Sequence, residues 1–329
     1  MGLNNVYRGA ISYVTGSHNF KFGGQVQTGS LRNNVSAPSD YEINLLNGVP
    51  NQVNFLPTPY SYHDTMTKTA FYGQDQWQIS HMTFNYGLRY DGLNTRYDDV
   101  NMQKTTYLPA RSFPGADVVG WKSLSPRLGW SWDVTGDGKT AVKVSASRYV
   151  VQEAMDLTRT VDPTSTAGGG LTRQWNDANG DFIPQGDPTI PAANGEIGPS
   201  PNALWGQPRT TFSYDPKMIT GYNVRPYNWE ITAGVQREIV SRVSANVAYF
   251  RRSFGDLTVV DNTLVAASNY DSFCVTAPTD SRLPGSISGS QVCGLLDLNP
   301  SKLGQLQQDR KSTRLNSSHT DISRMPSSA

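Results

Sequence analysis

Apolar and polar residues alternate with a period of two in four pairs of segments along this chain. In residues 228–237 the apolar side chains occupy every second position, and polar or small residues lie between them. A short turn at 240–241 leads into a second alternating segment, residues 243–250. Because successive side chains of a strand point to opposite faces, each segment predicts a strand with one apolar and one polar face.

The same hairpin unit occurs three more times upstream. The segment pairs are 7–14 with 19–28, 67–79 with 83–91, and 126–134 with 140–149. The third pair is joined by Thr-Gly-Asp-Gly, and an Asp-Gly pair favours a tight hairpin. One position departs from the pattern, because Asp75 falls on the same face as Phe71 and Trp77.

The connections within hairpins are short, whereas those between hairpins are long. The long segments are 29–66, 92–125, 150–227 and everything after 254. This arrangement is typical of outer-membrane barrels. We therefore predict an all-β fold: a partial antiparallel transmembrane β-barrel with short periplasmic turns and long extracellular loops. The alternative is a soluble β-protein in which the alternation arose by chance.

Charged and aromatic residues fit the barrel interpretation. Lys21, Arg89, Lys143 and Glu230 lie in mid-strand on the polar face, where a water-filled lumen tolerates charges that a soluble core would not bury unpaired. Six aromatic residues near strand ends are suited to the interfacial girdles of a barrel: Trp77, Tyr90, Trp132, Tyr149, Trp229 and Tyr249.

Composition excludes two classes of protein. Charged residues make up 17% of the 329 residues and the net charge is +1, so the chain has no electrostatic basis for binding nucleic acid. It contains no apolar run of about 20 residues, the length that a membrane-spanning helix needs.

The sequence contains no recognisable catalytic constellation. His18, His63 and His81 are too scattered to suggest a triad or a metal cluster. We therefore expect a protein that is not an enzyme and that uses no cofactor.

Two cysteines, Cys274 and Cys293, lie in the long segment after residue 254. If this segment is extracellular, its oxidising surroundings favour a disulfide that closes the loop. The alternative is two unrelated thiols.

Oxygen-bearing side chains recur at alternate positions in Asp177, Asn179 and Asp181, as at the start of a calcium-binding loop. Phe182 stands where such a loop has glycine, and Pro188 where it has glutamate. Polar turn chemistry is the alternative explanation.

The two ends of the chain carry separate signals. Residues 1–5 have neither the basic nor the apolar region of a secretory signal. Residues 309–319 (DRKSTRLNSSH) match a translated sequencing-library adapter, and 324–329 resemble its continuation. We therefore expect residues 309–329 to be an adapter-derived disordered tail, and 1–308 to be a fragment of an outer-membrane β-barrel domain without its plug and terminal strands.

Several motifs resemble the barrels of TonB-dependent outer-membrane receptors, and most closely the Oar-like group that carries a carboxypeptidase-regulatory-like domain. The matching segments are 70–77 (AFYGQDQW), 83–91 (TFNYGLRYD), 124–129 (LSPRLG), 225–230 (RPYNWE) and 249–252 (YFRR). The resemblance implies a 22-stranded barrel in the bacterial outer membrane that imports a bulky nutrient, a glycan or a peptide. It also implies a monomer surrounded by outer-membrane lipid and coupled to the TonB complex through the plug.

Under this interpretation the long loops recognise the extracellular ligand. Four loop aromatics are candidates for stacking on it: Trp175, Phe182, Trp205 and Tyr270. The alternative for these residues is packing within the loops. The alternative function for the whole chain is a secreted soluble β-protein that binds glycans or surfaces.

Overall fold

The computed structural model describes residues 2–208, 212–284, 287–302 and 308–312. The chain divides into two units. Unit 1 comprises Met1–Arg209 and Pro216–Leu257, and unit 2 comprises Thr210–Asp215 and Thr258–Ala329.

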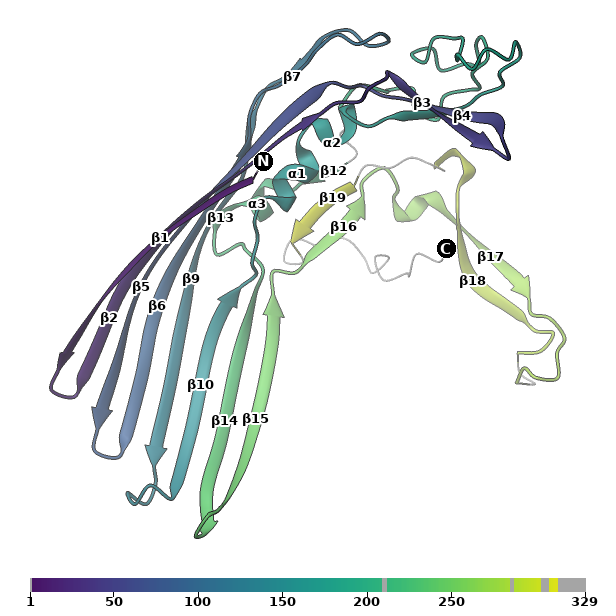
Figure 1. Cartoon of the computed structure of the whole chain (residues 1–329). Coiled ribbons are helices and arrows are strands. Elements are labelled where there is room, and N and C mark those ends of the chain that lie inside the picture. Colours follow the sequence, from purple (N-terminus) through teal and green to yellow (C-terminus); the bar gives the residue numbers. More distant parts are fainter. Residues whose placement is uncertain (1, 209–211, 285–286, 303–307, 313–329) are drawn as a thin grey trace. The chain divides into compact units, whose positions relative to one another are not determined.

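One large antiparallel sheet forms most of unit 1 (Figure 1). Its path contains β1 (Gly2–Thr15), β2 (His18–Val35), β5 (Tyr60–Ile79), β6 (Met82–Tyr97), β9 (Ala116–Asp133), β10 (Thr140–Val150), β14 (Tyr227–Val240) and β15 (Val243–Gly255), in this order. The short strand β13 (Thr220–Tyr222) adds to β9 in parallel. The four predicted hairpins are confirmed, and their short turns all lie at the lower end of the sheet in Figure 1.

The strands are longer than the alternation predicts. β5 starts at Tyr60, and its register with β2 continues to Val35 opposite Tyr60. In this upper part of β5, threonines occupy the positions on the same side of the strand as Phe71. The apolar and polar faces are then no longer distinct, so the pattern ends although the hydrogen-bonded ladder continues.

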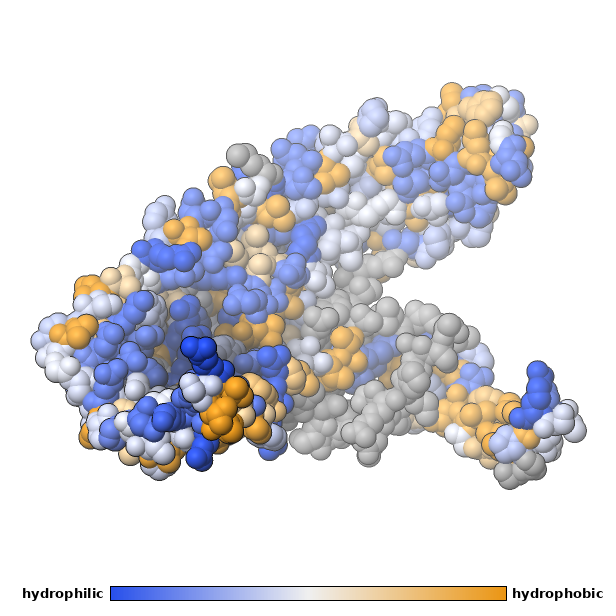
Figure 2. Space-filling view, turned by 60° about the horizontal axis from the view of Figure 1, so that its bottom comes forward, coloured by the Kyte–Doolittle hydropathy of each residue, from blue (hydrophilic) through white to orange (hydrophobic). Residues whose placement is uncertain are grey.

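One side of the sheet, here called the apolar face, carries mostly apolar side chains. Directly opposed residues share a face, and one such row contains Tyr13, Phe20, Asp75, Tyr86, Leu128, Ala146 and Ile231. Many side chains of this face are exposed, including Ile11 at 75% and Val247 at 76%. Figure 2, which brings the turn ends of the hairpins forward, shows hydrophobic residues interspersed with hydrophilic ones at the surface.

The apolar face extends only part of the way up the sheet. On β5 its last large apolar residue is Phe71, and on β6 it is Tyr90, followed by Gly92 and Asn94. A strand tilted in a bilayer crosses it with about 9–11 residues. The residues nearest the short turns supply this length, so Tyr60–Lys68 of β5 lie beyond the membrane-spanning segment.

The long connections of unit 1 contain structure of their own. They form two small sheets and three short helices: β3 (Tyr41–Leu46), β4 (Val49–Phe55) and β11 (Leu171–Gln174); β7 (Val100–Met102) and β8 (Arg111–Phe113); α1 (Asp156–Val161), α2 (Thr164–Ala167) and α3 (Pro216–Ile219). α1 packs against β6 and β9 of the large sheet. No helix among the described residues has the length and apolar character needed to cross a bilayer.

The described residues of unit 2 form two small sheets. One contains β12 (Phe212–Tyr214), β19 (Gln308–Ser312) and β16 (Thr258–Asn262), and the other contains β17 (Tyr270–Thr276) and β18 (Gln291–Leu298). The same described part of unit 2 also contains two 3-10 turns, η1 (Ala267–Asn269) and η2 (Pro300–Lys302). Of the tail expected at 309–329, residues 309–312 belong to β19, while 313–329 lie outside the described residues. The adapter origin of this segment stays a prediction.

Candidate functional site

The side of the large sheet opposite the apolar face, here called the polar face, carries polar, charged or small residues. One row across it contains Ser12, Lys21, Gln74, Gly87, Arg127, Ser147, Glu230 and Arg252. It lies one residue along each strand from an apolar row. The sheet is therefore a wall with one side suited to lipid and the other to water.

The four mid-strand charges predicted from the sequence all lie on the polar face. Lys21 and Glu230 belong to the row above, Arg89 pairs with Ser125, and Lys143 pairs with Ser131. Glu230 of β14 forms an ion pair with Arg252 of β15, and its Oε1 lies 2.5 Å from Nη2 of Arg252. These positions confirm the prediction for the charged residues.

One of the six predicted girdle aromatics, Tyr149, lies on the polar face instead of the apolar face, so the prediction for this residue is wrong. The register puts Tyr149 in line with Ser147 and Ser145 on the polar face, where the Arg127 guanidinium lies 5.0 Å from the ring centroid. The strand alternates regularly here, and Tyr149 is simply a large residue on the polar side.

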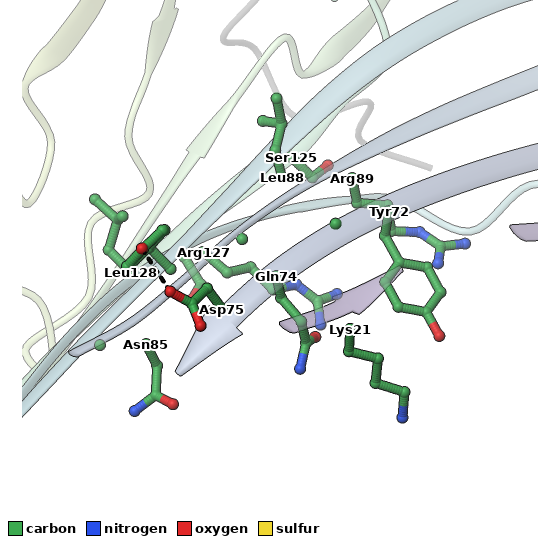
Figure 3. Close-up of a pocket in the computed structure, with 15 residues that line it drawn as sticks. Lys21, Tyr72, Gln74, Asp75, Asn85, Leu88, Arg89, Ser125, Arg127 and Leu128 are labelled. Atoms are coloured by element: carbon green, nitrogen blue, oxygen red, sulfur yellow. Dashed lines mark hydrogen bonds between the residues drawn. The ribbon is translucent and has the colours of Figure 1, made fainter. Parts of the chain in front are cut away.

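A cavity of about 500 Å³ lies along the polar face over β5, β6 and β9 (Figure 3). Lys21, Tyr72, Gln74 and Asn85 project from one side of the ribbon, while Leu88 and Leu128 project from the other. The Tyr72 ring leans over Gly23 of β2, and a Cβ at Gly23 would come within 2.5 Å of it. The absence of a side chain at position 23 therefore gives the ring its place along the wall.

Asp75 is an acidic residue on the apolar face, as its position in the sequence pattern indicates. Its Oδ2 accepts a hydrogen bond from the Tyr86 hydroxyl at 2.6 Å and lies 2.7 Å from His18 Nδ1. Its Oδ1 accepts from the Asn19 amide at 3.2 Å. The carboxyl is almost completely buried, and the His18 ring stacks between Phe20 and Trp77. A local network thus satisfies the carboxyl near the turn end of the sheet.

Two of the four candidate ligand-stacking aromatics are buried in the loops. Trp175 and Trp205 belong to a core with Val53, Phe55, Leu108, Leu171 and Ile197. The indole of Trp205 donates to the Gly169 carbonyl at 3.0 Å, and that of Trp175 to Glu196 at 3.2 Å. This environment favours loop packing over ligand stacking for both residues.

The other two aromatics do not join this core. Phe182 is 50% exposed on the same long connection, and Tyr270 is partly buried at the start of β17 in unit 2. The structure therefore does not gather the four residues in one site within either unit.

The acidic cluster at Asp177, Asn179 and Asp181 binds its own backbone. Asp177 accepts from the amides of Gly180, Asp181 and Phe182, and Asp181 accepts from the Ile183 amide. Within the described residues, no three His, Cys, Asp or Glu side chains lie close enough to hold a metal ion. This geometry favours the polar-turn interpretation.

Cys274 of β17 and Cys293 of β18 are joined by a disulfide. The two strands pair on either side of it, with Phe273 opposite Leu295 and Val275 opposite Val292. The disulfide therefore links neighbouring strands of a hairpin in unit 2.

A buried acidic pair that sequence reasoning missed lies where α1 meets the large sheet. Asp64 and Asp162 are both 0% exposed, and Nη1 of Arg159 lies 3.6 Å from one carboxyl and 3.1 Å from the other. The Arg159 guanidinium also stacks on Tyr62 at 3.6 Å. Burial and the Asp162 carboxylate raise the pKa of Asp64 to about 7, while Arg159 acts in the opposite direction. Nothing local in the sequence signals a contact between residues so far apart.

Comparison with known proteins agrees with this two-sided wall. Residues 4–253 match the family model described as an outer membrane beta barrel domain. The chain therefore belongs to this family, and the protein is an outer-membrane β-barrel protein with its apolar face toward lipid and its polar face toward the lumen.

One solved structure is similar at the level of the chain path. It is the closed form of the ferric-catecholate import receptor Fiu from E. coli K12, with 13% identity and a TM-score of 0.38. The match covers 78% of this chain and 32% of the receptor, so the chain spans about a third of that protein. No curated protein matches.

Proposed function

We propose that this chain is part of the barrel of a TonB-dependent outer-membrane receptor that imports a bulky nutrient, a glycan or a peptide. The observation that carries the proposal is the continuous sheet with an apolar and a charged face, short turns at one end and structured loops at the other. Such a wall separates lipid from an aqueous passage, and the loops are placed to meet an extracellular solute.

The energy for import would come from the TonB complex, acting through a plug domain inside the complete barrel. The motifs at 70–77, 83–91 and 225–230 support membership of the Oar-like group. We further propose that residues 1–308 belong to the barrel domain, that 309–329 are adapter-derived, and that the complete receptor is a monomer.

The exposed apolar face supports a barrel over the alternative of a secreted soluble β-protein. Ile11, Phe22 and Leu88 are all at least 50% exposed. In a soluble sandwich these side chains would pack against a second sheet. Binding and passage of a solute, rather than catalysis, is the activity that fits this arrangement.

An uptake assay in the source bacterium tests the proposal. The complete gene that encodes this chain is deleted, and accumulation of a fluorescent maltooligosaccharide and of a fluorescent peptide is measured, both too large for general porins. We expect deletion to abolish uptake of one probe, the complementing gene to restore it, and a protonophore to abolish it in the wild type. Uptake of both probes without the gene, or uptake that persists with the protonophore, would contradict the proposal.

A further inference from the structure

A second cavity on the polar face, about 300 Å³ in volume, is lined by an excess of positive charge. Its charged lining residues are Lys68, Arg89, Arg127, Arg148, Arg225 and a single carboxylate, Asp91. They come from β5, β6, β9 and β10 and from the residues just before β14. The cationic side chains that line the cavity therefore come from five segments of unit 1.

Aromatic rings hold three of these arginines in place, and the Arg148 guanidinium lies 4.1 Å from the ring centroid of Tyr227. The Arg127 guanidinium lies 5.0 Å from the ring centroid of Tyr149, and that of Arg225 lies 5.2 Å from the centroid of Trp121. Trp121 is itself fixed, because its indole donates to the Met218 carbonyl at 2.8 Å. A guanidinium that stacks by its face keeps the N–H groups of its edge for hydrogen bonds to a planar or tetrahedral anion.

The carboxylate in the lining, Asp91, forms an ion pair with Arg89. Both oxygens of Asp91 accept from Nε of Arg89, at 2.8 and 3.0 Å. Nη1 of Arg148 donates to the Leu124 carbonyl at 2.6 Å. Lys68, Arg127, Arg148 and Arg225 supply the remaining positive charge of the cavity.

The burial of Arg225 is the strongest indication that the cavity binds a ligand. Its side chain is 5% exposed, and its Nε has no hydrogen-bond partner among the described residues. Burial lowers the pKa of Arg225, while the carboxylates of Asp91 and Glu153 act in the opposite direction. Burying a cation is costly, and an anion bound in the cavity that Arg225 lines would offset this cost.

We propose that this cavity binds a phosphate-type oxyanion, either inorganic phosphate or the phosphate group of a monoester. A phosphate carries up to two negative charges and accepts hydrogen bonds from several directions, which suits cations that converge from five places. The volume admits the phosphate with a small attached group. The proposal concerns binding by the wall, and it stands whether or not the protein transports a solute.

Titration calorimetry on the full chain in detergent micelles tests it, with inorganic phosphate and methyl phosphate as separate probes. We expect both to bind to the wild type. Arg225→Gln should weaken binding by about tenfold or more, since it removes a charge-assisted hydrogen bond. Lys68→Gln, at a residue without a ring contact, provides a second variant if Arg225→Gln disturbs folding. Lys143→Gln is the matched control, because Lys143 lies on the same face outside this cavity.

Three results would overturn the proposal. The first is no detectable binding of either phosphate by the folded wild type. The second is equal weakening by Lys143→Gln and by the two cavity variants, which would indicate diffuse charge rather than a site. The third is tighter binding of a short polyglutamate peptide than of either phosphate, which would assign the cavity to an acidic protein segment. Near-ultraviolet circular dichroism checks that each variant is folded.

Discussion

Replacing Asp64 with asparagine should make the attachment of α1 to the large sheet largely independent of pH. In the wild type two fully buried carboxyls, Asp64 and Asp162, share the single guanidinium of Arg159. When both are ionised, one negative charge is left in excess in a buried place, which is unfavourable. The substitution Asp64→Asn would leave Asp162 and Arg159 as a balanced pair.

The sign and size of the effect follow from the pKa of Asp64, which is 3.8 for the ordinary group and about 7 in the folded protein. Between these values the folded state keeps a proton that the unfolded state has released. The stability from this group is therefore complete below the lower value and is lost as the pH rises through the upper one. Because one pKa unit corresponds to about 1.4 kcal/mol, the loss from the proton that Asp64 and Asp162 share is at most about 4 kcal/mol.

Hydrogen exchange of the α1 amides measures this local stability at a series of pH values, after correction for intrinsic exchange rates. The Asp162 amide, which donates to the Thr158 carbonyl at 2.9 Å, is one reporter. We expect wild-type protection to fall as the pH rises from about 4 to about 8, and that of Asp64→Asn to change little.

Asp98→Asn serves as the control for this experiment, because the Asp98 side chain is 44% exposed and pairs with His63. Two results would refute the reasoning. One is wild-type protection of the α1 amides that is equal at both ends of the pH range. The other is weaker protection of these amides in Asp64→Asn than in the wild type at about pH 8.

Three further predictions concern the apolar face, the loops and unit 2. Tyr86→Phe removes the hydrogen bond from the Tyr86 hydroxyl to Asp75 and should lower the free energy of unfolding in micelles, whereas Tyr13→Phe on the same face should change it little; equal effects would contradict the role of the network. Trp205→Ala should destabilise the loop core by about 3–5 kcal/mol, measured by protease resistance of the loops, and Phe182→Ala, at a half-exposed side chain, should not. Cys274→Ser opens a disulfide of sequence separation 19 and should cost unit 2 about 3 kcal/mol on denaturant unfolding; reactive thiols in denatured, unreduced wild type would refute the bond.

The membrane-spanning parts of the strands could be predicted from the sequence. In each strand, residues that face lipid alternate with residues that face the lumen, so apolar and polar side chains alternate. Lys21 and Glu230 on the polar face, and Phe71 and Trp77 on the apolar face, follow this local rule. The turn between β9 and β10 is equally clear from the sequence, since Gly136 and Gly138 adopt positive φ angles of 73° and 75° that few other residues tolerate. The irregular position of Asp75 was also visible, although its partner Tyr86 was not.

The arrangement of the loops depended on the tertiary structure. Leu171 of β11 pairs with Phe55 of β4, and Arg159 lies between Asp64 and Asp162, although long stretches of chain separate Leu171 from Phe55 and Arg159 from Asp64. Such contacts have no period along the sequence, so a local pattern cannot reveal them. For the same reason loop aromatics interpreted as ligand contacts can prove to be core residues, as Trp205 shows.

The sequence by itself thus determined the two-sided wall and its place in the outer membrane, because the lipid and the lumen act on each strand residue independently of distant ones. Only the tertiary structure decided which charges meet. Arg225 gains its place among the cations of the polar face beside two hairpins, β5–β6 and β9–β10, which lie far before it in the chain and are adjacent in the sheet. The fold and its orientation are local properties of this protein, and its candidate binding site is a long-range one.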